Sequence, residues 1–371
     1  MIYKTEVRPI KPIIKYPGGK SAELKIIKKY QPKIIDNYIE PFVGGGAVFF
    51  DTLPKNKSFI NDSSKELMLY YKAIKNNDEK FITFLEKINN IWMETRNIII
   101  DNKGSLINKF YNNTNEEITN FICDSLIITN VSFANFNEEY DNILIQKIKK
   151  SLSDKLKRTV VIAKKNHGIS DEDLIDNIES GIKSGIYTFI RFLFNNYKDL
   201  NIDDSILASL YFFIREYCYS SMFRYNKKGF FNVPYGGISY NKKNLTTKIN
   251  MMKSKNLSEK MSYTEIYNND FEVFLNSLSL NPDDFIFLDP PYDSDFSTYS
   301  NNKFNLHDHK RLRDFCKQTK AKFLLVIKNT ENIYDLYKEF YIFSFDKKYS
   351  VSFMNRNNRN VNHLLITNYQ I

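Results

Sequence analysis

The sequence predicts an α/β protein, and three segments carry this prediction. Phe285 to Leu288 form an apolar run that stops at Asp289-Pro290, as a buried strand does. Residues 38–50 indicate a short strand, a glycine-rich turn and the start of a helix. A second strand over 58–62 ends in an acid and precedes a helix over 63–74. Alternating strands and helices are typical of open α/β sheets, in which ligands bind at the carboxyl ends of strands.

The corner Asp289-Pro290-Pro291-Tyr292 is the first candidate site. Each proline fixes its own φ and biases the preceding residue away from helix, so the backbone is rigid and extended. The Asp289 carboxylate and the Pro290 carbonyl can accept both N–H groups of an exocyclic amine and stabilise a transition state in which nitrogen gains charge. Tyr292 can stack on a base that has left the duplex. On these four residues alone, a strand that simply ends in a turn is an equally good interpretation.

The composition indicates a large core and a polyanionic partner. The chain has 371 residues, of which 42% are hydrophobic, enough for two domains or for one domain with a big insertion. Its 53 Lys and Arg exceed its 43 Asp and Glu, which gives a formal net charge of +10. This excess favours a polyanion but does not separate DNA from RNA or from a membrane surface.

Cysteines and apolar segments predict a cytoplasmic protein that does not enter a membrane. Cys123, Cys218 and Cys316 include no CxxC pair and indicate buried thiols in a reducing compartment. None of them follows a proline, which excludes the Pro-Cys nucleophile of cytosine-C5 methyltransferases. The sequence contains neither an apolar segment of signal-peptide type nor a run of about 18 apolar residues.

The segment Lys15 to Ser21 predicts a tight loop rather than the P-loop of nucleoside-triphosphate-binding proteins. It ends in Gly-Lys-Ser, but Ile14 stands where that pattern needs its first glycine. Gly18 and Gly19 instead allow the backbone to come close to a ligand. A helix over 22–30 follows, with apolar residues on one face.

A second glycine-rich turn and a following acid indicate a nucleotide-binding unit. Gly44 to Gly46 let the backbone approach a cofactor, and the helix behind them offers free N–H groups. Their spacing is not G-x-G-x-x-G, so a dinucleotide is a weak expectation. Asp62, at the end of the next strand, is placed to accept both hydroxyls of a ribose. A cap for the helix over 63–74 is the alternative role for Asp62.

Four motifs, taken in order, resemble one family. They are Lys15-Tyr16-Pro17-Gly18-Gly19-Lys20, Glu40-Pro41-Phe42-Val43-Gly44-Gly45-Gly46, Asn61-Asp62 and Asp289-Pro290-Pro291-Tyr292. Their type and order are similar to those of Dam-type DNA adenine-N6 methyltransferases, the D12 class and alpha group. Each motif alone is ordinary, whereas four in order are specific. The sequence departs at Tyr16 and Pro17, where Trp and Ala are common in the family, although Tyr16 keeps a ring that can stack.

This resemblance implies a Rossmann-like, S-adenosylmethionine-dependent methyltransferase fold with an inserted, mainly helical target-recognition domain. Its sheet would have seven strands, mostly parallel with one reversed. The catalytic domain would be discontinuous, over 1–76 and 262–371, with the recognition region over 77–261. Within that region we expect a helical insertion over 77–210 and a DNA-reading hairpin over 215–243. Apolar residues at helical spacing in the insertion agree with this, over 81–92, 118–128 and 182–193.

The resemblance also assigns roles to individual residues. Catalysis would depend on Asp289, Pro290, Pro291 and Tyr292. S-adenosylmethionine would be held by residues of the motifs and by one further acid: Tyr16, Gly18, Gly19, Lys20, Glu40, Phe42, Gly44, Gly46, Asp62, Asp270 and Asp289. For Asp270 a helix cap is the alternative. No metal is expected, because His307 and His309 have no third ligand nearby and favour the start of a charged helix that reaches Lys317.

Residues 215–237 interleave basic and aromatic side chains around a turn at 226–229. Arg224 is of the type that reads guanine bidentately in the major groove, and neighbouring lysines suit phosphates. The resemblance assigns DNA contacts, including a wedge into the base stack, to Tyr219, Met222, Arg224, Asn226, Lys227, Lys228, Asn232, Pro234 and Tyr235. An exposed, solvated hairpin with an aromatic underside is the alternative.

The last part of the chain predicts the closing strands of the sheet, over 323–327, 345–353 and 363–367. Tyr299 and Phe304 would cover the flipped base. The polar, basic loop over 354–360 would touch phosphate.

The expected activity is site-specific transfer of a methyl group from S-adenosylmethionine to N6 of a flipped adenine in double-stranded DNA. The expected partners are duplex DNA and a type II or IIS restriction endonuclease encoded nearby, with the protein acting as a monomer. GATC is the commonest target in the family, but the insertion favours a longer or asymmetric site. Cytosine-N4 methylation is the alternative that Asp289 in place of Ser disfavours. A DNA-binding protein with a degenerate catalytic corner is disfavoured by the intact Lys20, Asp62 and Asp289.

Overall fold

The computed structural model describes residues 9–112, 114–128, 133, 135–291, 304–348 and 360–370. The chain divides into two compact units: unit 1 consists of Met1–Asn77 and Ser254–Ile371, and unit 2 is the continuous segment Asp78–Lys253. The chain returns to unit 1 at Ser254, before helix α11 (Lys255–Ser262), whereas the expected return was at residue 262, the end of that helix. The reason is that α11 packs on unit 1, where Lys260 donates a hydrogen bond to the Thr52 carbonyl at 2.6 Å. Within the described residues, none of the helices is long and apolar enough to span a bilayer.

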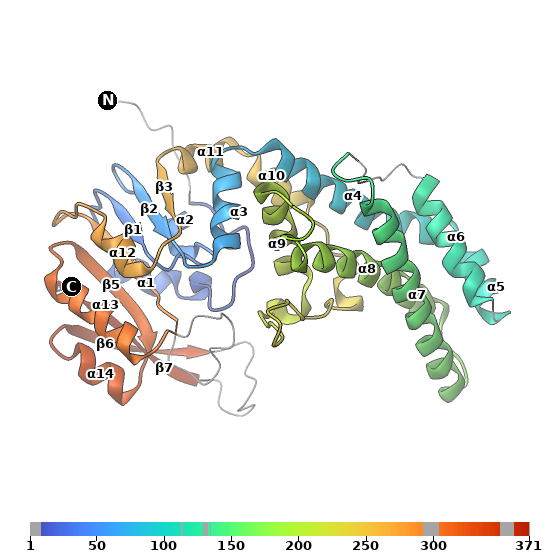
Figure 1. Ribbon diagram of the computed structural model, residues 1–371. Helices are drawn as coiled ribbons and strands as arrows, with labels where there is room; N and C mark the ends of the chain where they lie inside the picture. Colours follow the sequence, from blue (N-terminus) through green and yellow to red (C-terminus); the bar gives the residue numbers. More distant parts are fainter. Residues whose placement is uncertain are drawn as a thin grey trace. The chain divides into compact units, whose positions relative to one another are not determined.

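Unit 1 is built on a seven-stranded sheet with the spatial order β3-β2-β1-β4-β5-β7-β6 (Figure 1). β7 runs antiparallel to both of its neighbours, and the other pairs of adjacent strands are parallel. This confirms the expected sheet with one reversed strand. The strands are β1 (Tyr38–Glu40), β2 (Ser58–Asn61), β3 (Thr264–Tyr267), β4 (Phe285–Leu288), β5 (Lys322–Lys328), β6 (Tyr341–Lys348) and β7 (Asn360–Thr367).

Three strands differ from the sequence-based expectation, and one of them is β7, which begins at Asn360 rather than at 363. β6 begins at Tyr341, before the expected start at 345, and residues 349–353 lie outside the described part of the chain. β3 was not expected at all. It lies at the edge of the sheet and is only half buried, with Glu265 paired to Lys57 at 3.0 Å. An edge strand of this kind lacks the continuous apolar run that marks a strand buried on both faces.

A large apolar core fills the space between the sheet and the helices α12, α13 and α14. Ile286 and Leu325 contribute from the strands, and Phe274, Leu312 and Tyr337 contribute from the three helices. Because side chains alternate across a strand, the same strands present their other residues to the opposite face. The helices of unit 1 include α1 (Leu24–Tyr30), α2 (Ala47–Asp51), α3 (Lys65–Lys75), α11, α12 (Phe271–Asn276), α13 (Leu306–Gln318) and α14 (Glu331–Tyr337).

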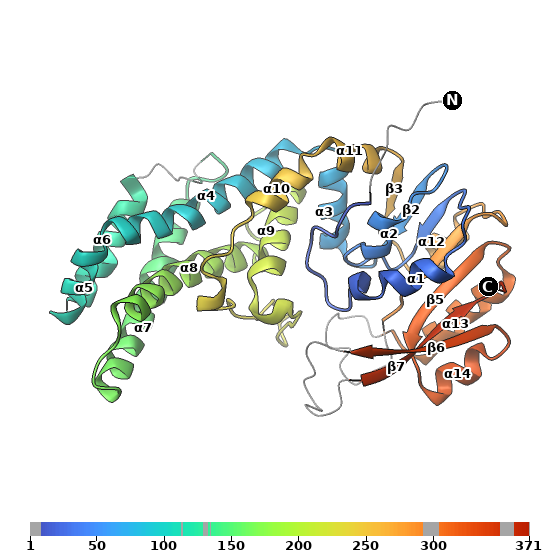
Figure 2. The same cartoon turned by 180° about the vertical axis from the view of Figure 1, so that it is seen from behind.

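Unit 2 is helical, as the insertion predicts (Figure 2). Asp78, Ser170 and Asp203 cap the first turns of α4, α8 and α9 through their side-chain oxygens, so the helices start where the sequence offers a cap. Its helices include α4 (Glu79–Asp101), α5 (Lys103–Tyr111), α6 (Asn115–Ile128), α7 (Tyr140–Lys165), α8 (Asp171–Asn195), α9 (Asp204–Tyr217) and α10 (Thr246–Met252).

The long helices α7 and α8 approach each other closely at two glycines of α8. A Cβ atom added to Gly185 would lie 2.5 Å from the Ile148 Cα, and one added to Gly181 would lie 3.2 Å from the Leu152 Cα. Because these neighbours are backbone atoms, no change of rotamer relieves the overlap. The two glycines are four residues apart and therefore lie on one face of α8, where they set the distance between the helices.

Substitution of Gly185 by alanine is expected to lower the free energy of unfolding of unit 2 by about 1–3 kcal/mol, because α7 must move away to make room. Urea titration followed by the fluorescence of Trp92, the single tryptophan, measures this loss. Gly104→Ala is the matched control, since a Cβ there meets nothing within 4 Å. That change should leave stability unaltered or raise it by up to about 1 kcal/mol. Equal stability of the Gly185→Ala protein and the unmodified protein would refute the packing argument.

Candidate active site

Four acidic residues lie at one edge of the sheet, at or just after the carboxyl ends of four strands that are adjacent and parallel. Glu40 ends β1, Asp62 follows β2, Asp289 follows β4, and Asp270 comes three residues after the end of β3. The spatial order β3-β2-β1-β4 brings these acids into one row, although they are far apart in the sequence. In open parallel sheets this edge is where ligands bind. The row therefore defines the candidate active site.

The strongest link across this edge is the ion pair between Lys20 and Asp289. The Lys20 ammonium lies 2.5 Å from the Asp289 carboxylate and donates a second hydrogen bond to the Gly18 carbonyl at 3.1 Å. The Lys20 side chain is only 3% exposed, whereas that of Asp289 is 20% exposed and remains accessible. The pair joins the N-terminal Gly-Gly-Lys loop to the corner at Pro290. Tyr292, the predicted stacking residue, lies outside the described residues, as do Tyr299 and the loop 354–359.

The glycines of the second turn make room for aromatic side chains of the protein itself. Gly44 and Gly46 have φ values of +48° and +72°, which favour glycine. A Cβ on Gly44 would lie 3.1 Å from the Tyr16 ring, and one on Gly46 would lie 2.6 Å from the Tyr71 hydroxyl oxygen. Tyr71 also donates a hydrogen bond to the Gly44 carbonyl at 2.9 Å. Tyr16 thus packs on the turn, which is a role that the sequence did not indicate.

Asp62 holds the glycine turn in place. Its carboxylate accepts hydrogen bonds from the Gly44 N–H at 3.1 Å and from the Ser64 N–H at 2.9 Å. Burial raises the pKa of Asp62, and hydrogen bonds from backbone N–H groups, those of Ser64 and Gly44 among them, oppose this rise. Ser64, rather than Asp62, is the N-cap residue of α3, because its hydroxyl accepts from the Leu67 N–H. Each oxygen of Asp62 keeps a second lone pair that can accept a ligand hydroxyl.

Asn61 and Glu40 fix the strand ends from within. The Asn61 amide donates to the carbonyls of Pro41 and Asn269 at 3.0 and 3.1 Å and accepts from the Asn269 N–H at 2.8 Å. It therefore ties the segments after β1, β2 and β3 together. Glu40 is buried and accepts a hydrogen bond from the Tyr38 hydroxyl at 2.7 Å. Burial raises the pKa of Glu40 well above its ordinary value.

Asp270 caps α12 by accepting from the Glu272 N–H at 3.0 Å, which is the alternative role considered for it. It also forms an ion pair at 2.6 Å with Arg311, a residue of α13 that the sequence did not single out. Arg311 lies 4.7 Å from the centre of the Phe271 ring. Phe42 contacts Phe271 and Phe304 at centroid distances of 5.4 and 5.6 Å, so an aromatic cluster stands beside Asp270. Phe304, which was expected to cover the flipped base, packs against Phe42 and Phe271 in this cluster.

The charged-helix interpretation of His307 and His309 is confirmed. Both belong to the first turn of α13, where Asn305 and Asp308 form a capping box. His309 is buried with its ring 4.7 Å from that of Phe304.

In unit 2 the chain reverses at the expected turn. The Asn226 N–H donates to the Phe230 carbonyl at 2.8 Å, and Tyr225 and Phe231 form an antiparallel bridge. The Asn226 side-chain oxygen accepts from the N–H groups of Lys228 and Phe230, so it serves the turn. Arg224 donates across the hairpin to the Asn232 side-chain and backbone oxygens at 2.9 and 3.3 Å.

Helix α8 holds the returning arm of this hairpin through three side chains spaced four residues apart. Tyr187 and Arg191 donate to the Val233 carbonyl at 2.8 and 3.1 Å. Asn195 donates to the Phe231 carbonyl and accepts from the Phe231 N–H at 3.0 and 2.8 Å. Residues one helical turn apart lie on one face, so these polar groups follow the extended arm as a neighbouring strand would. The hairpin is therefore anchored rather than free.

The predicted DNA-contact residues differ in their exposure. Tyr219 is 51% exposed, and Arg224, Lys227, Lys228 and Pro234 are also exposed, while Met222 and Asn232 are half buried. Tyr235 is the exception, because it is 8% exposed and lies between the rings of Trp92 and Tyr187. It supports the hairpin from within and is not available to touch DNA. Residues 215–217, expected in the hairpin region, form the last turn of α9.

The chain matches the family model of the D12 class N6 adenine-specific DNA methyltransferases over residues 16–157 and 129–351. The chain belongs to this family. It is an adenine-specific DNA methyltransferase, and the interpretations as a cytosine-N4 enzyme or a degenerate DNA-binding protein are set aside.

Two relatives resemble this methyltransferase over most of its length. Type II methyltransferase M.CviBI of Paramecium bursaria Chlorella virus NC1A is 27% identical over 364 residues, which cover 97% of this chain and 100% of that protein. Type II methyltransferase M.MjaIII of Methanocaldococcus jannaschii is 26% identical over 338 residues, 87% of this chain and 86% of the relative. DNA adenine methylase of Vibrio cholerae is 33% identical over only 141 residues, 36% of this chain and 46% of its own.

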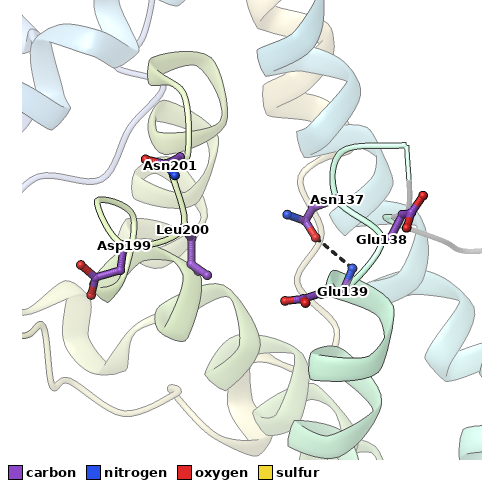
Figure 3. Close-up of a pocket in the computed structure, with 6 residues that line it drawn as sticks. All are labelled: Asn137, Glu138, Glu139, Asp199, Leu200 and Asn201. Atoms are coloured by element: carbon purple, nitrogen blue, oxygen red, sulfur yellow. Dashed lines mark hydrogen bonds between the residues drawn. The ribbon is translucent and has the colours of Figure 1, made fainter.

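A pocket in unit 2 of the methyltransferase does not suit DNA. It lies between the segment before α7 and the segment before α9 and is lined by Glu138, Glu139 and Asp199; in Figure 3 the Glu139 carboxylate points toward the opposite side, whereas Glu138 and Asp199 point outward. Asn137, Leu200 and Asn201 complete the lining, which contains no cation. Because DNA is a polyanion, three carboxylates disfavour its phosphates. The acids at the edge of the sheet remain the candidate active site.

Glu216 is a second anchor within unit 2, and its contacts predict a pH dependence of stability. Its buried carboxylate pairs with Lys243 and Lys248, each at 2.7 Å, and so holds the segment after the hairpin on α9. Burial opposes ionisation of Glu216, but the two lysines outweigh it and lower its pKa below the ordinary value. A lowered folded-state pKa stabilises the fold above the unfolded-state pKa, and this stability is lost as the pH falls through the folded-state pKa.

Glu216→Gln is therefore expected to destabilise unit 2 at about pH 7 by roughly 3–5 kcal/mol, because two lysines lose their buried partner. The difference from the unmodified protein should shrink as the pH falls below about 4.3. Urea titrations followed by Trp92 fluorescence test this. Glu117→Gln, which breaks an exposed pair with Lys109, should change stability by less than about 1 kcal/mol. A difference that is the same at every pH would contradict the assignment.

Proposed function

We propose that this methyltransferase uses S-adenosylmethionine and methylates an adenine that has been turned out of duplex DNA and placed against Asp289 and Pro290. The observation that carries the proposal is the Lys20–Asp289 ion pair, because it holds the N-terminal glycine loop and the Asp-Pro corner at one edge of the sheet. The glycine turn and Asp62 stand at the same edge. Cofactor and base would therefore meet where these motifs meet.

The residues at this edge suit the cofactor. S-adenosylmethionine would supply an electrophilic methyl group on a cationic sulfonium, and the accessible carboxylate of Asp289 complements such a cation. Gly18 has φ +75°, and a Cβ there would meet nothing within 4 Å, so open space faces this loop. We assign the cofactor site to the expected residues other than Asp270: Tyr16, Gly18, Gly19, Lys20, Glu40, Phe42, Gly44, Gly46, Asp62 and Asp289. The Arg311 ion pair gives Asp270 a structural role at the border of this site.

Asp289 and Pro290 would act on the exocyclic amine. The N6 lone pair of adenine is delocalised into the ring, so nitrogen becomes acidic only as it gains a methyl group. The Asp289 carboxylate and the Pro290 carbonyl would accept the two N–H groups and favour the state in which nitrogen carries positive charge. The proton then leaves through Asp289. Lys20 orients the carboxylate, and Tyr292, with Pro291 before it, would stack on the base.

We further propose that the hairpin of unit 2 reads the target sequence. It is anchored by α8, as recognition requires, and it exposes Arg224 with Lys227 and Lys228 at its turn. Arginine reads guanine edges, while lysines bind phosphates without regard to sequence. Tyr219 and Met222 are placed before the hairpin as wedges for the base stack. Since relatives are named type II methyltransferases, we propose a restriction endonuclease as the functional partner of a monomeric enzyme.

Asp289→Ala is expected to reduce turnover by a factor of about 100–1,000 or more, while duplex binding is largely kept, because the lost acceptor acts on the transition state. Base-resolved mapping of DNA from expressing cells would show N6-methyladenine in one short motif for the unmodified protein and none for the variant. Asp283→Ala removes an exposed acid at the other end of β4 and should leave methylation intact. Normal methylation by Asp289→Ala would sink the mechanism, and methylated cytosine in place of adenine would overturn the base assignment.

Arg224→Ala is expected to lower kcat/KM on the mapped sequence, with a loss of about 1–3 kcal/mol of transition-state stabilisation. It should also relax the preference at one base position. Lys227→Ala should instead weaken binding to every sequence alike. Methylation rates on duplexes that carry each single-base change of the mapped site distinguish the two. If Arg224→Ala slows all sequences equally, the hairpin does not read bases through this residue.

A further inference from the structure

Positive charge in unit 2 is concentrated in two segments, helix α7 and the hairpin with the residues after it. The unit as a whole is almost balanced, with 24 Lys and Arg against 21 Asp and Glu. Within α7 there are eight cations and only two acids, Asp141 and Asp154. The rest of unit 2, apart from the hairpin and the residues after it, therefore contains more acidic than basic residues.

The cations of α7 form a stripe on the solvent side of the helix. Lys150, Lys157 and Lys164 are exposed and seven residues apart, which is about 700° or close to two full turns. Arg158 and Lys165 are exposed beside them. We call these five residues the α7 ridge. The stripe from Lys150 to Lys164 is about 21 Å long.

The opposite side of α7 explains why the ridge faces solvent. Leu144, Ile148, Leu152 and Leu156 repeat every four residues and are buried. Ile148 and Leu152 lie against the glycines of α8, so the helix cannot rotate without losing this contact. The direction of the ridge is therefore fixed by packing.

The ridge is not neutralised within the protein. Among the residues that the structure describes, no carboxylate lies within ion-pair distance of these five cations, and Arg158 donates one hydrogen bond, to the Asp154 carbonyl at 3.1 Å. Three lysines elsewhere in unit 2 are paired: Lys80 with Asp203, Lys109 with Glu117, and Lys253 with Glu86. A row of unpaired cations repels itself, and a polyanion relieves that repulsion.

We propose that the α7 ridge binds the phosphate backbone of the duplex DNA that the enzyme methylates. In Figures 1 and 2 the C-terminal part of α7 and the segment after α9 lie on the same, lower side of unit 2. A stripe of about 21 Å matches roughly six base pairs at 3.4 Å each. The proposal rests on DNA as the substrate and does not require that the hairpin reads bases. It gives the long insertion a function, which is to add affinity that is independent of sequence.

The test is the salt dependence of DNA binding by the full-length protein. The variant Lys150→Gln/Lys157→Gln/Lys164→Gln removes three cations from the ridge, and glutamine has a helix propensity close to that of lysine. The control Lys80→Gln/Lys109→Gln/Lys253→Gln removes the same charge from paired positions of the same unit. Fluorescence anisotropy would measure Kd on a labelled duplex of about one helical turn and on one of about four turns, over a range of salt concentrations.

On the long duplex the slope of log K against log salt should fall by about 2.7 in the ridge variant, since each lost phosphate contact removes about 0.9. The short duplex and the control variant should show little change, and kcat at saturating DNA should be unaltered. An unchanged slope on the long duplex, or an equal fall in the control, overturns the proposal. If the unmodified protein does not bind duplex DNA at all, the substrate itself is wrong, and this result is distinguishable from failure of the ridge alone.

Discussion

The ion pair between Lys20 and Asp289 is the contact on which the candidate active site depends. It joins residues 269 positions apart and leaves the lysine buried while the carboxylate stays accessible. A buried ammonium is costly unless it is paired, so the pair specifies one arrangement of the N-terminal loop against β4. The strand order supplies the rest, because it sets Asp62 and Glu40 in the same row. The proposed methylation of an exocyclic amine would then use hydrogen-bond acceptors, the Asp289 carboxylate and the Pro290 carbonyl, that the fold already holds in position.

Unit 2 uses the same device for a different purpose. Glu179 and Glu216 are fully buried, and each is held by two cations: Arg96 of α4 and Lys183 of α8 pair with Glu179, and Lys243 and Lys248 after the hairpin pair with Glu216 of α9. Lys183 extends this by donating to the Asn241 carbonyl at 2.6 Å. Buried pairs of this kind favour one geometry more than they favour stability. The hairpin proposed to read DNA would need that geometry more than additional stability.

Much of this architecture was predictable, because the motifs at the strand ends are local patterns. The strand before Asp289, the glycine turn and the helical insertion each follow from a periodicity or a turn residue. β3 did not, since an edge strand with Glu265 lacks an apolar run. Arg311 did not either, because its partners on α12 come near only in the folded chain. Tyr235 resembled a surface aromatic until the helices that bury it were placed around it.

Because neighbouring strands of the sheet are far apart in the sequence, they leave the ribosome at different times. β1 lies between β2 and β4, yet β4 follows only after the whole of unit 2 and β3 have been made. During that interval, on the order of ten seconds or longer, one edge of β1 has no neighbouring strand. An unpaired apolar edge invites association with other chains. A unit 2 that folds early, on its own local contacts, would bury its apolar surface during this interval, so that the edge of β1 is the main part left exposed.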